Sequence, residues 1–140
     1  MWIVYAFLGA ITAAAVAIFA KLGLEKIDTT LATTVRGVIM AGFLVAMTAA
    51  LGKFNGFSLS SFSGKEWMYI FIAGVAGALS WLFSFFALKY GPASGAVSID
   101  KLSLVFVVIV AAFVFGESIT WKSGIGVVLM TIGALLIAFK

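Results

Sequence analysis

The chain alternates long apolar segments with short polar ones. A helix needs about 20 apolar residues to cross a bilayer, and five windows meet this length: residues 2–20, 30–51, 66–88, 93–115 and 120–139. The fourth window is rich in Val and Phe, but inside lipid each backbone polar group needs a partner, which favours helix over strand. The pattern predicts an all-α integral membrane fold, with five transmembrane helices in a single domain over residues 1–140.

Two polar links between these windows are long enough to have a character of their own. Residues 21–29 carry several charges and are expected to form a solvated link. Residues 52–65 form the longest loop, rich in Gly, Ser and Phe. This loop either lies along the membrane interface, with Phe54, Phe57 and Phe62 inserted, or is disordered.

Helix starts are marked at two further places. Gly91 and Pro92 predict a tight turn, after which Ser94 is a candidate N-cap for the fourth helix. Thr120 is a candidate N-cap for the fifth. Three tryptophans fall at the starts of the first, third and fifth spans. These starts lie on one membrane side, because two crossings separate each from the next, as in an interfacial aromatic belt: Trp2, Trp67 and Trp121.

Composition agrees with this pattern and excludes several classes of protein. The 140 residues are 64% hydrophobic and 10% charged, whereas soluble domains carry about 25% charged residues. Without Cys or His, the chain has no disulfide framework and lacks the commonest metal ligands and general base. We expect no enzyme activity, no cofactor, no metal and no nucleic-acid partner; the lipid bilayer is the expected surrounding.

Basic residues near the span ends are almost balanced between the two membrane sides. The N-terminal side has Lys53, Lys65 and Lys122, and the other has Lys21, Lys26, Lys89 and Lys140, with Arg36 slightly inside. Because Lys/Arg asymmetry sets orientation, two outcomes stay open. The chain inserts in both orientations, or a small excess fixes one.

Charge inside the spans is confined to Arg36, Asp100 and Lys101. Asp100 and Lys101 cost ~5–7 kcal/mol together in the worst case, and thirteen Val, Ile, Leu or Phe between residues 97 and 115 return roughly 4–8. Arg36 lies at a similar depth to Asp100, which predicts an Arg36–Asp100 pair between helices. This pair either locks two helices together or takes part in gating.

Helix three places Trp81 deep in its span, next to Ser84. A buried Trp beside hydroxyl groups is typical of a pocket for an amphipathic molecule, and equally of a packed core. Thr12 adds a hydroxyl at the middle of helix one. The candidate substrate-binding residues are therefore Trp81, Ser84, Asp100, Lys101 and Thr12.

Several short motifs together resemble one repeat of the EamA-like family, in the drug/metabolite transporter superfamily. They are Ala20-Lys21-Leu22, Arg36, Phe86-Ala87-Leu88-Lys89-Tyr90, Pro92-Ala93-Ser94 and Phe115-Gly116-Glu117-Ser118. The charges at Asp100 and Lys101 depart from the commonest version and resemble short, single-repeat members. The resemblance implies transport of metabolites or drugs, and two five-helix repeats of opposite topology.

These observations lead to two hypotheses. The first is a small secondary transporter in the cell membrane, a multi-pass protein acting as an antiparallel (dual-topology) homodimer on a small-molecule substrate. The alternative is a non-transporting membrane subunit that packs against or regulates a partner membrane protein. Helix one lacks the membrane-embedded Glu of the small multidrug resistance proteins, which argues against the same exchange of protons for cations.

Overall fold

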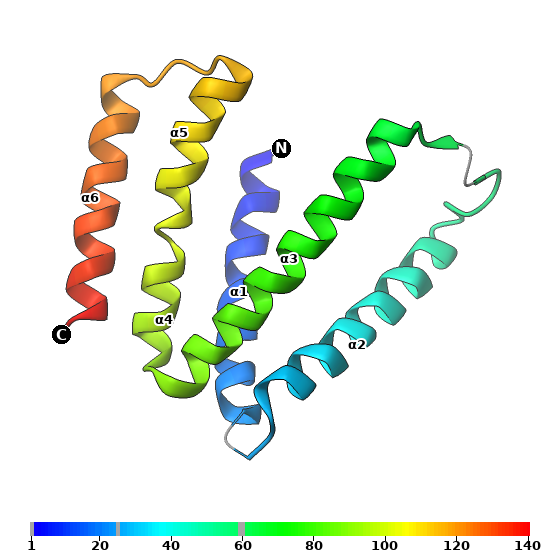
Figure 1. Ribbon diagram of the computed structural model, residues 1–140, viewed down its shortest axis with the longest axis horizontal. Helices are drawn as coiled ribbons and strands as arrows, with labels where there is room; N and C mark the ends of the chain where they lie inside the picture. The colour runs from blue at the N-terminus through cyan, green and yellow to red at the C-terminus, as the bar shows by residue number, and fades with distance from the viewer. Residues whose placement is uncertain (1, 25, 59–60) are drawn as a thin grey trace. The chain divides into compact units, whose positions relative to one another are not determined.

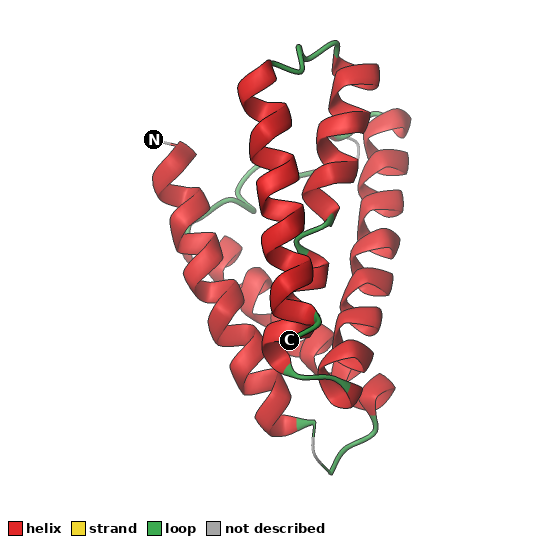
Figure 2. Cartoon of the chain, turned by 90° about the vertical axis from the view of Figure 1, so that its left-hand side faces the viewer, coloured by secondary structure: helices red, strands yellow, loops and turns green. Residues whose placement is uncertain are grey.

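A computed structural model of the chain describes residues 2–24, 26–58 and 61–140. In this described part the regular elements are all helices (Figures 1 and 2). They are α1 (Trp2–Gly23), α2 (Thr29–Ala50), α3 (Gly64–Tyr90), α4 (Ala93–Asp100), α5 (Ser103–Phe115) and α6 (Trp121–Ala138). Five helical segments are long and apolar enough to cross a membrane, with α4 and α5 together forming the fourth, Ala93–Phe115. The predicted all-α fold with five spans is confirmed.

Helices α2 and α6 each begin at a residue whose side chain accepts a hydrogen bond from a backbone N–H of the first turn, whereas α4 begins at a proline. Asp28 Oδ1 accepts a hydrogen bond from Leu31 N at 2.9 Å, and Thr120 Oγ1 accepts one from Ser123 N at 3.2 Å, so the Thr120 N-cap is confirmed. The expectation for Ser94 is wrong. Pro92 is the N-cap of α4, without a side-chain cap bond, because its fixed φ already sets the helix entry.

The loop between α2 and α3 contains a row of aromatic rings. Ring centroids are 6.3 Å apart for Phe54 and Phe57, 5.9 Å for Phe57 and Phe62, and 5.5 Å for Phe62 and Trp67. Ser63 and Glu66 bond each other's backbone N–H in a capping box that begins α3. The rings order this loop against the start of α3, while its insertion in the membrane interface stays a prediction. Residues 59 and 60 of the expected loop lie outside the described residues.

The chain divides into two compact units, Met1–Leu22 with Ala87–Lys140, and Gly23–Phe86. In the first unit α6 runs beside α4 and α5 (Figure 1). Gly95 allows α4 to lie close to the end of α6. A Cβ at position 95 would lie 3.1 Å from Pro92 Cγ and 3.7 Å from the Ala138 backbone. Gly116 ends α5 with φ at +67°, in the left-handed region where a side chain would be strained. The single-domain organisation of residues 1–140 stays a prediction.

Most apolar side chains point outward rather than into a core. The buried residues of the described chain are Leu24, Thr29, Phe85, Leu88, Gly95 and Ala134. Large side chains along every span are exposed instead, among them Phe7, Phe43, Phe71, Phe106 and Leu136. Such faces suit lipid, since hydrocarbon solvates them without cost. The protein is a multi-pass integral membrane protein in contact with the bilayer.

Lys21 differs from its expected place in a solvated link. Helix α1 continues to Gly23, so Lys21 lies in its last turn, half-buried. Its Nζ donates to the Leu88 carbonyl at 2.6 Å and to the Gly91 carbonyl at 2.9 Å. The last carbonyls of a helix have no partner within the helix. The Lys21 ammonium group donates hydrogen bonds to such carbonyls, and the negative end of the helix dipole stabilises its positive charge.

This geometry predicts that Lys21 stabilises the fold. Lys21→Met keeps the aliphatic stem but leaves two partly buried carbonyls without a donor, so we expect a loss of about 1–3 kcal/mol in the free energy of unfolding. Thermal unfolding of the purified protein in detergent measures it. The matched control is Lys26→Met, because Lys26 is exposed and its replacement should cost less than about 0.5 kcal/mol. Equal stability of the two variants would contradict the capping role.

Candidate functional site

The fourth span is interrupted at Lys101 and Leu102. Lys101 N–H is shared between the carbonyls of Val97 and Ser98, at 3.3 and 3.2 Å. Beyond it, Leu102 donates to Ile99 at 2.9 Å, Leu104 to Lys101 at 3.1 Å, and Val105 to Leu102 at 3.0 Å. These last bonds link residues three apart, which is the 3₁₀ pattern. A 3₁₀ stretch in the middle of a helix often marks a hinge or a functional position.

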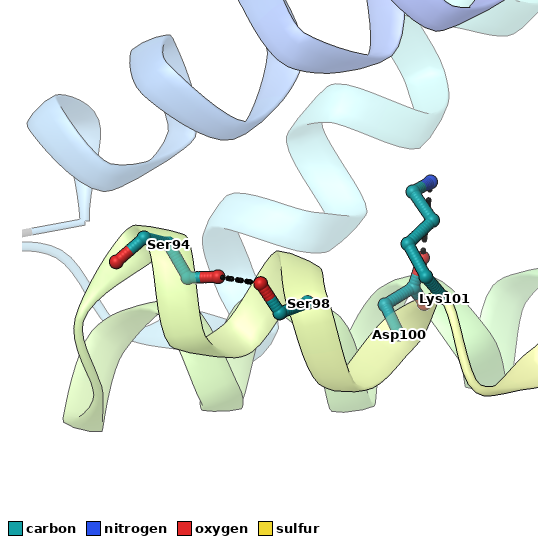
Figure 3. A network of polar contacts seen from close by, with 4 residues as sticks. All are labelled: Ser94, Ser98, Asp100 and Lys101. Atoms are coloured by element: carbon teal, nitrogen blue, oxygen red, sulfur yellow. Dashed lines mark hydrogen bonds and ion pairs between the residues drawn. The ribbon is translucent and has the colours of Figure 1, made fainter. Parts of the chain in front are cut away.

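The interruption coincides with two charged side chains. At the change to 3₁₀ bonding, Lys101 Nζ lies 3.8 Å from Asp100 Oδ2, and the two side chains are 51% and 49% exposed. Figure 3 shows the pair at the end of α4, together with the bond from Ser98 Oγ to the Ser94 carbonyl at 2.7 Å. The two charged side chains thus make one polar point in the span.

This polar point lies within the fourth span, away from both of its ends. Asp100 is the eighth residue of α4, a rise of about 10 Å from the first, whereas a bilayer core is about 30 Å thick. Non-helical backbone at this depth is tolerated where it is buried in protein or lines a water-filled cavity. Broken helices of this kind form ion and substrate sites in many secondary transporters.

Arg36 makes two aromatic contacts in the unit Gly23–Phe86. Its Cζ lies 4.7 Å from the ring centroid of Trp81 and 5.1 Å from that of Phe85. A guanidinium over a ring face is attracted by the ring quadrupole, by about 0.5–2 kcal/mol depending on desolvation. The expected pocket residue Trp81 is therefore brought together with Arg36. The Arg36–Asp100 pair stays a prediction, since the carboxylate of Asp100 is described beside Lys101.

The hydroxyl groups named by the sequence differ in how they are used. Thr12 Oγ1 donates to the Leu8 and Gly9 carbonyls of its own helix, at 2.9 and 3.0 Å, and Ser98 does likewise with Ser94. Ser84 is half-buried, and no hydrogen bond of its hydroxyl is found in the described chain. The Ser84 hydroxyl donor is therefore unused within the described chain, whereas the Thr12 hydroxyl has only its acceptor lone pairs unused. Substrate contact by either residue stays a prediction.

Two features were not expected from the sequence. Thr29, Thr33 and Arg36 follow each other at helical spacing, on one strip of α2. Thr29 is 1% exposed, and its buried hydroxyl has no hydrogen-bond partner among the described atoms. A search for polar residues at intervals of three, four and seven would have found this strip. Groups of three carboxylates that could hold a metal ion are not found in the described residues.

Comparison with known proteins agrees with the helical pattern and the motifs. Residues 1–139 match the model of the EamA-like transporter family. A protein of a Sinorhizobium species named "Uncharacterized transporter in cobO 3'region" is 36% identical over 137 residues, which cover 98% of this chain and 96% of that protein. No solved structure matches the chain. With five spans and a family match over nearly its whole length, the chain belongs to the EamA-like transporter family.

Proposed function

We propose that the protein is a small secondary transporter of metabolites or drugs and that it works as an antiparallel homodimer. The proposal rests on the break between α4 and α5, where Asp100 and Lys101 coincide with a change to 3₁₀ backbone bonding. Charged side chains at this depth are costly in lipid. A water-filled passage past this point, opened alternately to either side, would remove that cost.

An inverted second copy would complete the transport unit. The chain has five spans, whereas two repeats of opposite topology are what the family resemblance implies. The matched relative is almost fully covered by this chain, so it too has the length of one repeat. Both orientations are accessible to a chain whose basic residues nearly balance. The exposed apolar faces leave room for a partner helix as well as for lipid.

Some of the predicted substrate-binding residues would contact polar groups of the substrate, and others its apolar part. In this proposal Lys101 attracts an anionic group, and Asp100 orients Lys101 through their contact at 3.8 Å. Trp81 stacks on the apolar part of the substrate, with Ser84 and Thr12 as hydroxyl contacts. Arg36, whose Cζ lies 4.7 Å from the Trp81 ring centroid, would attract a negative charge that comes close to that ring.

Neutralising Asp100 should separate function from folding. In liposomes that contain only this chain, we expect Asp100→Asn to lower solute uptake at least about tenfold, equivalent to about 1.4 kcal/mol, because the Lys101 charge loses its partner. The folded yield should stay near that of the parent, since a half-exposed pair stabilises little. Uptake of radiolabelled amino acids and aromatic carboxylates, with size-exclusion profiles, measures both quantities.

Glu117→Gln is the matched control, because Glu117 is an exposed carboxylate beyond the end of α5 and its loss should leave uptake unchanged. Joint loss of yield and uptake in Asp100→Asn would make the pair a structural lock. No uptake by the pure parent protein for any of these solutes would favour an accessory subunit over a transporter.

The inverted homodimer predicts two orientations of one chain in cells. Tags at both termini, tested with a reporter that is active on one membrane side only, should each give signal on both sides. Adding two lysines to one loop should shift the population toward one orientation and reduce transport. A single orientation for every copy of the untouched chain would eliminate the inverted homodimer.

A further inference from the structure

Arg36 carries a positive charge in a span, and no ion pair joins it to a carboxylate among the described residues of its own unit. The two described carboxylates of Gly23–Phe86 are used elsewhere: Asp28 Oδ1 caps α2 through Leu31 N at 2.9 Å, and Glu66 Oε2 accepts from Ser63 N at 2.7 Å. The described contacts of Arg36 are the two ring contacts. Rings stabilise the charge but accept none of the five N–H donors of a guanidinium.

The surroundings of these donors are partly apolar and partly polar. Phe85 is 5% exposed, and Trp81 is half-buried one helical turn before it. Ser84 lies three residues after Trp81, so it borders the same face of α3, and its hydroxyl is free in the described chain. On α2, the strip of Thr29 and Thr33 leads along the helix to Arg36, with the Thr29 hydroxyl buried and unpaired.

We propose that Arg36, Trp81, Phe85 and Ser84 form the binding site for the carboxylate of an amphipathic organic anion. The planar guanidinium binds a carboxylate through two parallel N–H bonds, and the Ser84 hydroxyl donates a further one. The apolar body of the ligand packs on the exposed part of Trp81. This inference rests on the proposed transporter function for its meaning as a substrate site, but binding itself is measured without transport.

The site is specific for a negative charge on an apolar molecule. A carboxylate neutralises Arg36 at about 10 Å of rise from the start of α2, where an unpaired charge is costly. A neutral amide of the same shape cannot accept both N–H bonds with full charge. A cation of the same shape is repelled. The ring contacts hold the guanidinium in place before the ligand arrives, which reduces the ordering cost of binding.

Fluorescence quenching of Trp81 tests this site directly. Replacing Trp2, Trp67 and Trp121 with Phe leaves Trp81 as the reporter in detergent-purified protein. We expect saturable quenching by para-bromobenzoate, about tenfold tighter than by para-bromobenzamide, with no saturation by para-bromobenzylamine. Arg36→Gln should abolish the difference between the acid and the amide. Arg36→Lys, which keeps the charge in case the Gln variant folds poorly, should weaken binding of the acid but preserve the order.

A second reporter controls for simple partition into the detergent. A variant with Trp67 alone, and Phe at positions 2, 81 and 121, should show unsaturable quenching that Arg36→Gln does not alter. Equal quenching of Trp81 by acid and amide, or no effect of either Arg36 change, would overturn the inference. If quenching by the acid disappears when phosphatidylglycerol replaces detergent, the guanidinium binds lipid phosphate, and the substrate site is overturned.

The transporter proposal and the binding-site proposal can be overturned independently of each other. Uptake in liposomes without acid-specific quenching would leave the transporter standing and remove this site. Acid-specific quenching in a protein that moves no solute would keep the site and remove the transporter.

Discussion

Every polar group in a bilayer span must find a partner, and this requirement governs the structure. The helices meet it along most of their length by internal hydrogen bonding, and their hydroxyl groups meet it by bonding to carbonyls one turn back, as Thr12 and Ser98 do. It is met differently at three places. Lys21 bonds the end of α3, Arg36 lies over two rings, and Asp100 and Lys101 lie at a broken helix.

The family motifs gain a physical meaning from these exceptions. Lys21 belongs to the motif that ends α1, and its two acceptors belong to the end of α3 and the turn after it. Segments about 70 residues apart in sequence are therefore joined by one ammonium group. The turn itself begins α4 at Pro92, and Gly95 lets α4 approach the end of α6. Residues of these motifs therefore make the contacts that join separate segments within the first unit.

Hydropathy alone was sufficient to predict the fold class and the five spans, because lipid permits few alternatives to a helix. It could not predict the division of the fourth span. Ile99, Leu102 and their neighbours are ordinary helix residues, and the change to 3₁₀ bonding depends on local backbone geometry. Lys21 was expected in solvent because its charge suggested a loop, whereas its acceptors lie in a distant segment. Long-range contacts of this kind leave no periodic signal.

The candidate site was predicted in part. The sequence identified Arg36, Asp100, Lys101 and Trp81 as the polar and aromatic exceptions of the spans. Depth along the helix suggested a carboxylate partner for Arg36, but depth says nothing about direction around the helix. Within its own unit the described contacts of Arg36 are aromatic, and its pairing with Asp100 stays a prediction.

We propose that the broken fourth span faces water within the membrane. The chain has no Cys, so single cysteines can be introduced without background, and their labelling by a membrane-impermeant methanethiosulfonate reagent reports access of water. We expect rapid labelling of Ser98→Cys and Ser103→Cys, on either side of the break, and no labelling of Val110→Cys, about two turns beyond the break in α5. If the cysteines at positions 98 and 103 were as unreactive as the one at position 110, the break would face lipid or packed protein, and the proposed passage would be contradicted.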